Sequence, residues 1–229
     1  MKKIGLVVAM LDEQKELYNK FGEVVNVYNY GRIKVTEFSY NDKAIYMADS
    51  GIGELSASLA TQLLIIKFGC EVILNFGVVG SLDKRYRCGD VVVVQEIVHY
   101  DFSLQYSDKD SFGKYPFQRD SFVFKNDISF VEKLNKVIGS FPLVRIASGD
   151  KFIDDSKLKE WLVNHFSCNI CDMESMGIFL ACSNFNVPCF MIKAVSDNAD
   201  EDANISFMDT LKNGITFYVD AVLTLLNIL

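Results

Sequence analysis

Short, uninterrupted apolar segments alternate along this chain with segments of helical periodicity, and this alternation constrains the fold most. The clearest apolar segments are 4–9, 71–76 and 189–195, which are typical of buried strands. Between them, segments such as 54–68 carry apolar residues at helical spacing. Strands that are apolar on both faces and separated by helices predict an α/β fold, with helices on both faces of a mixed sheet.

The full set of expected elements fits one domain. With 229 residues, half of them hydrophobic, and neither a linker nor an internal repeat, we expect a single domain over 1–229. Residues 100–120 are polar, aromatic and irregular, which is typical of a functional loop. Strands are expected at 4–9, 24–28, 33–39, 44–48, 71–76, 91–98, 143–147, 168–172 and 189–195, and helices at 11–20, 54–68, 128–139, 155–165, 173–185 and 206–229.

Charge and hydropathy exclude several classes of partner. The formal net charge is −7 and no run of Lys or Arg is longer than two, which disfavours nucleic acid and anionic membranes. No segment has the roughly 18 consecutive apolar residues of a membrane span. Lys2-Lys3 and the apolar run after them lead into Asp12-Glu13 without a signal-peptide cleavage site, so we expect a cytoplasmic protein.

The cysteines and histidines give no metal or redox site. Cys168 and Cys171 have C-x-x-C spacing, but no second pair completes a zinc site, so the six cysteines are expected to be reduced core residues and no metal or other cofactor is expected. His165 falls in a predicted helix and is expected to be structural. His99 ends a strand beside the 100–120 loop, where a ligand-site role and a structural role are equally plausible. No histidine is placed for a Ser hydrolase triad, and G-x-S-x-G is absent.

Carboxylates at the ends of apolar strands are the strongest local sign of function. Asp197 follows an apolar run, and an unpaired charge there is costly, while strand ends in open α/β sheets bind ligands. Burial would raise the pKa of Asp197 and make it a proton donor, although a turn-forming role for this aspartate fits equally well. Glu13 and Glu174 begin helices, where a helix-dipole role is the alternative.

Two glycine-bearing segments follow predicted strands, Ser50-Gly51-Ile52-Gly53 and Gly77-Val78-Val79-Gly80. Glycine permits tight turns and close approach of the backbone to a ligand. Neither segment matches a dinucleotide or phosphate-loop pattern, so a structural turn explains each as well as a ligand does.

Taken together, these segments resemble those of bacterial 5′-methylthioadenosine/S-adenosylhomocysteine nucleosidases. The resemblance covers essentially the whole chain, and six motifs in the family's order and spacing make it more specific than any one of them. The motifs are Ala9–Glu13, Ser50–Gly53, Gly77–Gly80, Ser148–Ile153, Asp172–Glu174 and Val195–Asp200.

The resemblance implies a fold, a reaction and a set of roles. The fold is a three-layer α/β/α sandwich of the nucleoside-phosphorylase type, and the reaction is hydrolysis of the N-glycosidic bond of adenosyl thioethers by a homodimer, without a cofactor. Asp197 resembles the acid that protonates purine N7, and Glu13 resembles the base that activates water. The resemblance implies that Phe152 and Ile153 contact the purine and that Met173 and Glu174 contact the ribose. The other substrate-binding positions that it implies are Met10, Ile52, Val78, Ser196 and Phe207.

The family's 5′-thioalkyl pocket borrows residues from the partner subunit, and the loop 100–117 would supply them here, with Phe102, Tyr106 and Pro116. Two positions depart from the family pattern. Asp172 stands where Glu is usual, and Val78 stands where Ser is frequent, and neither departure removes a catalytic carboxylate.

Three alternatives remain. A nucleoside phosphorylase of the same fold typically has an arginine where this chain has Asn75, and phosphate binding favours arginine, so hydrolysis is preferred. A non-catalytic nucleoside-binding protein is disfavoured by the retained Glu13, Glu174 and Asp197. A hydrolase of another adenosyl nucleoside, such as 5′-deoxyadenosine or aminodeoxyfutalosine, would share the base and ribose contacts.

Overall fold

The computed structural model describes residues 2–104, 111–118, 120–213 and 215–229. Its helices are α1 (Leu11–Phe21), α2 (Glu54–Leu63), α3 (Val131–Ile138), α4 (Ser156–Phe166), α5 (Ser175–Phe185), α6 (Ala203–Asn213) and α7 (Val219–Ile228). Its strands are β1 (Lys2–Val8), β2 (Val24–Tyr30), β3 (Ile33–Tyr40), β4 (Lys43–Asp49), β5 (Val72–Ser81), β6 (Val91–His99), β7 (Phe124–Lys125), β8 (Leu143–Ser148), β9 (Ile170–Asp172) and β10 (Cys189–Asp197).

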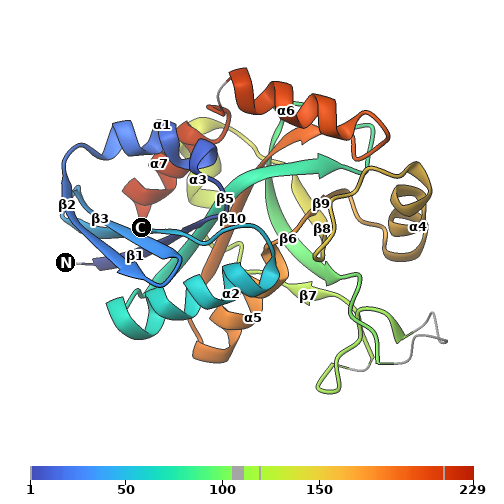
Figure 1. Ribbon diagram of the computed structural model, residues 1–229, viewed down its shortest axis with the longest axis horizontal. Coiled ribbons are helices and arrows are strands. Elements are labelled where there is room, and N and C mark those ends of the chain that lie inside the picture. Colours follow the sequence, from blue (N-terminus) through green and yellow to red (C-terminus); the bar gives the residue numbers. More distant parts are fainter. Residues whose placement is uncertain (1, 105–110, 119, 214) are drawn as a thin grey trace.

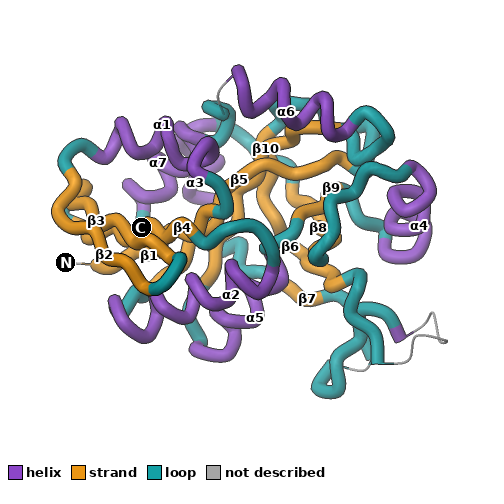
Figure 2. The backbone as a smooth tube through the Cα atoms, viewed as in Figure 1, coloured by secondary structure: helices purple, strands orange, loops and turns teal. Residues whose placement is uncertain are grey.

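The predicted three-layer sandwich with a mixed sheet is confirmed. Figures 1 and 2 show the strands between α1, α3 and α7 on one face and α2 and α5 on the other. Successive residues of β1 divide between the two layers, because side chains alternate along a strand: Leu6 and Val8 pack in the α1 layer and Val7 in the α2 layer. Both faces of the central strands are therefore buried, as their continuous apolar sequence predicts.

The sheet is closed at one end. The path β4-β1-β5-β10 is connected by parallel pairs, and β3 and β2 extend it as an antiparallel meander beyond β4. Beyond β10, the pairs β10–β6, β6–β8, β8–β9 and β9–β5 return to β5. This closure brings the ends of β5, β9 and β10 together. None of the helices in the described ranges has the length and apolar character that a bilayer crossing requires.

Two local predictions are wrong. The expected turn Gly77–Gly80 lies inside β5, where Ala194 and Val195 of β10 pair with Val78 and Val79. The expected C-terminal helix, 206–229, is two helices, α6 and α7. Tyr218, just before α7, is fully buried, and its hydroxyl donates to the carbonyl oxygen of Glu13 at 2.7 Å. Helical periodicity alone could not reveal this tertiary contact.

Smaller differences concern element lengths. The expected helix 54–68 ends in a π-helical turn, Leu64–Phe68, which Gly69 closes in the left-handed conformation (φ +70°). The two-residue strand β7 was not expected, and it pairs with Glu96 and Ile97 of β6. Neither difference changes the sheet order at the centre of the molecule.

Candidate active site

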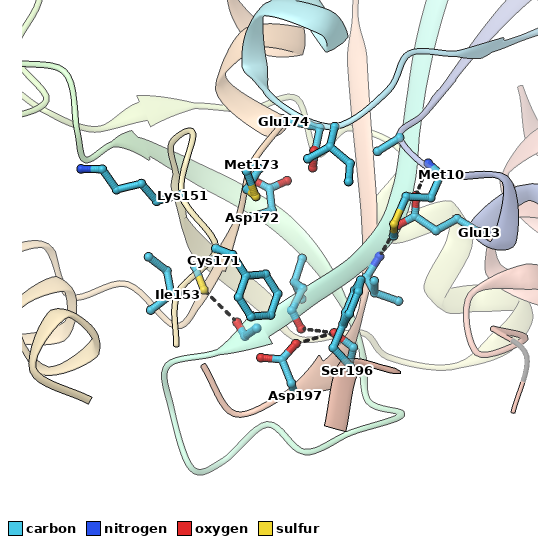
Figure 3. Close-up of a pocket in the computed structure, with 17 residues that line it drawn as sticks. Met10, Glu13, Lys151, Ile153, Cys171, Asp172, Met173, Glu174, Ser196 and Asp197 are labelled. Carbon is cyan, nitrogen blue, oxygen red and sulfur yellow. Dashed lines mark hydrogen bonds between the residues drawn. The ribbon is translucent and has the colours of Figure 1, made fainter. Parts of the chain in front are cut away.

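A cavity of about 300 Å³ lies where β1, β5, β9 and β10 end (Figure 3). Every residue that the sequence predicted to be catalytic or to contact the nucleoside lines it, although these residues are scattered from position 10 to position 207. They are Met10, Glu13, Ile52, Val78, Phe152, Ile153, Met173, Glu174, Ser196, Asp197 and Phe207; the other lining residues are Ala9, Val79, Gly80, Lys151, Cys171 and Asp172.

Glu13 reaches the cavity from the first turn of α1. Its carboxylate accepts hydrogen bonds from the backbone N–H of Met10 at 3.0 Å and of Val78 at 2.9 Å, and its side chain is almost fully buried. Burial raises the pKa of Glu13, while the two N–H donors oppose this rise because they stabilise the ionised form. The result is a buried carboxylate held in one orientation.

Gly77 makes room for Glu13. A Cβ atom at position 77 would lie 2.5 Å from Oε1 of Glu13, a distance that no real contact tolerates. The space at Gly80 is also tight, since a Cβ there would lie 3.0 Å from Ala199 Cβ and Cys171 Sγ and 3.1 Å from Asp197 Oδ1. These glycines therefore allow close approach of side chains to a strand, rather than the turn that the sequence suggested.

Asp197 ends β10 on another side of the cavity (Figure 3). Ser196 Oγ donates to its Oδ2 at 2.7 Å, and the backbone N–H of Ala199 donates to its Oδ1 at 2.9 Å. Burial raises the pKa of Asp197 and outweighs these two hydrogen bonds. Asp197 thus combines both local alternatives: it forms an Asx-type turn with Ala199 and is also a buried carboxyl group facing a cavity.

Glu174 approaches the cavity beside Asp172, just before α5. The backbone N–H of Gly53 donates to Oε1 of Glu174 at 3.0 Å, which ties the start of α2 to this carboxylate. Burial and the nearby Asp172 carboxylate raise the pKa of Glu174 to about 8. Gly53 has φ +100°, a conformation that favours glycine, and its Cβ would meet Asp150.

A buried ion pair between Lys193 and Asp172, which lines the cavity, was not predicted from the sequence. Lys193 Nζ lies 2.8 Å from Oδ2 of Asp172, and both side chains are almost fully buried. The hydroxyl of Ser175 also donates to Asp172, at 2.6 Å. A lysine inside the apolar run of β10 was the available signal, because a buried lysine requires a partner. Asp172, which stands where Glu is usual in the family, is thus the partner of Lys193.

The remaining predicted contacts form the apolar wall of the cavity. Phe152 and Phe207 meet edge to face with ring centroids 5.6 Å apart, and Phe152 is 38% exposed. Ile153 beside them is buried, whereas Ile52 on the opposite segment is 57% exposed. A planar ligand could stack on the exposed aromatic face.

The contribution of Phe102 and Pro116 to a partner subunit's pocket stays a prediction, because these residues would face the cavity of a second chain. Phe102 does not line the cavity and stacks on Tyr115 with centroids 4.0 Å apart. Pro116 is exposed. Tyr106 lies outside the described residues.

One further polar cluster adjoins the site. The potential ligand atoms of Glu54, His99 and Asp101 lie within 4.8 Å of one another, close enough to hold a cation. The sequence pointed to His99 but not to the two carboxylates. Glu54 was hidden because a glutamate in the first turn of a helix is usually solvated.

Comparisons with known proteins agree with this geometry. The profile of the Phosphorylase superfamily matches residues 3–227. An aminodeoxyfutalosine nucleosidase of Helicobacter pylori is 32% identical, over 93% of each chain, and a 5′-methylthioadenosine/S-adenosylhomocysteine nucleosidase of Exiguobacterium is 33% identical, over 92% of this chain and 91% of the relative.

Solved structures of two Helicobacter pylori enzymes are similar to this chain over its whole length. An aspartate-to-asparagine mutant of the Helicobacter pylori methylthioadenosine nucleosidase, with 5′-methylthioadenosine in its active site, has a TM-score of 0.92 at 29% identity, and each chain is covered completely. The native futalosine hydrolase of Helicobacter pylori also has a TM-score of 0.92, at 29% identity, covering all of this chain and 98% of that one. By sequence and by fold, this chain belongs to the phosphorylase superfamily.

Proposed function

We propose that this protein hydrolyses the N-glycosidic bond of 5′-modified adenosines, with 5′-methylthioadenosine and S-adenosylhomocysteine as substrates. The observation that carries the proposal is the meeting of three carboxyl groups, Glu13, Glu174 and Asp197, around one cavity with an aromatic wall. The names of the relatives support the same reaction.

Asp197 is the proposed general acid. Its raised pKa keeps a proton on the carboxyl group to higher pH than for an exposed aspartate. Transfer of that proton to purine N7 makes adenine a neutral leaving group. Ser196, which donates to Asp197 Oδ2, orients the acid and receives support from Thr210, whose hydroxyl donates to the Ser196 carbonyl at 3.1 Å.

Glu13 is the proposed base for the attacking water. The N–H groups of Met10 and Val78 stabilise its ionised form and fix its direction, although burial opposes ionisation. A water held by this carboxylate would attack the anomeric carbon while the bond to the purine breaks. Glu174 would bind the ribose hydroxyls. Because its pKa is raised to about 8, its hydrogen bonds to them become charge-assisted as the pH rises towards that value, and such bonds strengthen as positive charge develops on the sugar.

Water is favoured over phosphate as the nucleophile. Phosphate binding would need cations at the cavity, and among its described lining residues Lys151 is the one cationic side chain. Asn75 stands where phosphorylases of this fold typically have an arginine. Its amide is buried and donates to the carbonyl of Val7 at 3.0 Å. The amide nitrogen is therefore engaged within the sheet.

A homodimer is the proposed assembly. Ile52, Leu55, Leu59 and Ile66 are each more than half exposed and recur on one side of α2 and its flanking turns. Ile52 also lines the cavity, so a partner seated on this apolar stripe would adjoin the substrate. The six cysteines are all free, which fits a reducing compartment such as the cytoplasm.

The decisive test is a substrate panel read by adenine release. Purified protein is given methylthioadenosine, S-adenosylhomocysteine, 5′-deoxyadenosine and aminodeoxyfutalosine, each with and without phosphate. Adenine and a free pentose without any need for phosphate are expected. A rate that requires phosphate and yields a pentose 1-phosphate would identify a phosphorylase instead. Binding without turnover of any nucleoside would identify a non-catalytic binding protein.

A further inference from the structure

His99, at the end of β6, joins three segments that surround the cavity without lining it. Its Nε2 lies 2.8 Å from Glu54 Oε2 and 3.1 Å from Asp101 Oδ1. Its Nδ1 lies 2.6 Å from the hydroxyl of Tyr115. Glu54 and Tyr115 belong to other segments, whereas Asp101 follows His99 by two residues, so the ring connects the end of β6 with the start of α2 and with the segment around Tyr115.

Each carboxylate that contacts His99 is linked to a cavity residue. Glu54 begins α2, and the N–H of the preceding Gly53 donates to Glu174. Asp101 Oδ2 accepts the backbone N–H of Asp150 at 3.1 Å, and Asp150 is followed directly by the cavity segment 151–153. The imidazole ring is thus two contacts away from both the proposed ribose and purine sites.

Direct contacts between the two sides complete the cluster. Asp150 Oδ1 accepts the backbone N–H of Glu54 at 2.7 Å. Ser148 Oγ donates to Glu54 Oε1 at 2.9 Å and accepts the N–H of Met176 at 3.0 Å. The starts of α2 and α5 and the segment after β8 therefore share one hydrogen-bonded network centred on Glu54.

A positive charge on the ring would stabilise this network, because two poorly exposed carboxylates this close repel each other. Burial raises the pKa of Glu54, while its hydrogen bonds to His99 and Ser148 oppose this rise because they favour the ionised form. Burial lowers the pKa of His99, but the Asp101 and Glu54 carboxylates outweigh burial and raise that pKa to about 9. Tyr115, the other titratable group facing the ring, stays neutral because burial raises its pKa to about 12.

We propose that His99, as an imidazolium bridging Glu54 and Asp101, is a positioning residue that sets the affinity of the site for its nucleoside. The inference rests on the proposed function, because it assigns Glu174 to the ribose and segment 151–153 to the purine. His99 holds the backbone that presents these groups, and it does not itself line the cavity. Its loss therefore acts on KM rather than on the chemical step.

The main experiment compares His99→Gln with His165→Gln, a matched change of the second histidine, which stacks on Trp161 of α4 away from the cavity. Adenine release is measured from about pH 6 to about pH 10. For His99→Gln we expect KM to rise about tenfold with kcat within about twofold of wild type. KM of both proteins should change near pH 8 as Glu174 titrates, and wild-type KM should rise further as the pH passes about 9, whereas KM of the variant should show no second rise there. An unchanged KM, or a fall in kcat alone, would overturn the proposal.

A second variant covers the case in which His99→Gln does not fold. The double variant Glu54→Gln/His99→Gln removes one buried carboxylate together with its cation, so it should recover folding and part of the affinity that the single variant loses. The single variant Glu54→Gln completes the comparison. If the losses of affinity in Glu54→Gln and His99→Gln add up to the loss in the double variant, the two residues do not act together and the bridge is contradicted.

A metal bridge in place of the imidazolium is tested with a chelator. EDTA should leave wild-type KM unchanged; a KM that rises with EDTA and is restored by Zn²⁺ would mean that a metal, not a proton, bridges the carboxylates.

Failure of the proposed function has its own signature. If wild-type protein releases no adenine from any nucleoside, the proposed function fails. In that case the affinity for methylthioadenosine, measured by calorimetry over the same pH range, still tests whether His99 controls binding. Equal affinities of wild type and His99→Gln would refute that control.

Discussion

At the scale of single residues, Asp197 offers the clearest test of chemistry. The change Asp197→Asn keeps the size of the side chain and an acceptor oxygen for the N–H of Ala199, with the amide NH2 facing Ser196 Oγ, but it removes the transferable proton. Because general acid catalysis contributes about 10²–10⁴-fold, we expect kcat to fall by about 10³-fold with the melting temperature little changed. Adenine release and thermal unfolding measure the two quantities.

Asp209→Asn is the matched control, since Asp209 is exposed on α6 and does not line the cavity. Its kcat should stay near the wild-type value. In wild-type enzyme, kcat should decline as the pH rises through the raised pKa of Asp197, because the acid loses its proton. Near-wild-type turnover of Asp197→Asn would mean that another group protonates the purine.

Glu174 links a single residue to the stability of the fold. Its pKa is raised from 4.5 to about 8 in the folded protein, so its stabilising contribution is complete below about pH 4.5 and is lost as the pH rises towards 8. The change Glu174→Gln keeps an acceptor for Gly53 and removes this titration. We therefore expect the melting temperature of the variant, relative to that of wild type, to increase as the pH rises from about 5 to about 8.

Glu160→Gln, on the exposed side of α4, is the control for this comparison and should follow the wild-type curve. Parallel curves for wild type and Glu174→Gln would show that Glu174 is ionised in the folded state throughout this range.

The sequence indicated which carboxylates belong to the site, but it did not indicate the side chains that they contact. Asp197 and Glu174 were recognisable because charged residues seldom follow apolar strands without a reason. The pair of Asp172 and Lys193 was not, because a hydrogen bond between β9 and β10 depends on which strands become neighbours. The same holds for Glu54, whose partners His99 and Ser148 come from β6 and β8.

At the scale of elements, apolar patterning predicted the strands but not where their glycines act. Gly77 and Gly80 looked like turn residues, and only the packing of Glu13 and Asp197 against β5 shows that they provide space. Similarly, α6 and α7 share a continuous helical pattern, and the break between them is stabilised by the burial of Ile215 and Tyr218 in the core. Local periodicity carries no information on such distant contacts.

The contact between α2 and α5 gives a prediction at this scale. A Cβ at Gly177 would lie 2.2 Å from the carbonyl oxygen of Glu54, so α5 approaches the backbone of α2 where the polar network begins. The change Gly177→Ala should force the helices apart and lower the free energy of unfolding by about 1–3 kcal/mol. It should also raise KM, because the start of α2 positions Glu174 through Gly53.

Urea denaturation and adenine release measure the two effects of Gly177→Ala. Ser183→Ala is the control on the exposed side of α5, and it should change the free energy of unfolding by no more than about 0.5 kcal/mol. A denaturation midpoint for Gly177→Ala equal to that of wild type would show that the two helices can separate without cost.

At the scale of the whole molecule, the fold class followed from the alternation of elements, whereas the closure of the sheet did not. Strand order depends on pairs such as β5–β9 and β6–β10, which join residues about a hundred positions apart. This closure is also what creates the cavity, since it gathers the ends of β5, β9 and β10. The site therefore belongs to the topology as much as to its motifs.

The apolar stripe on α2 gives the prediction for the assembled molecule. Leu55 is 71% exposed and Leu59 56% exposed, one helical turn apart, beside Ile52 at the cavity. If this stripe is the dimer interface, Leu55→Glu/Leu59→Glu should halve the mass measured by light scattering, because two charges per chain would have to be buried. The monomer should also bind nucleoside more weakly, since the open side of the cavity loses the partner.

Val137→Glu, at an equally exposed apolar position on α3, should remain dimeric. A double variant that keeps the dimer mass would locate the interface on another face, and a monomeric wild type with full activity would show that the cavity needs no partner.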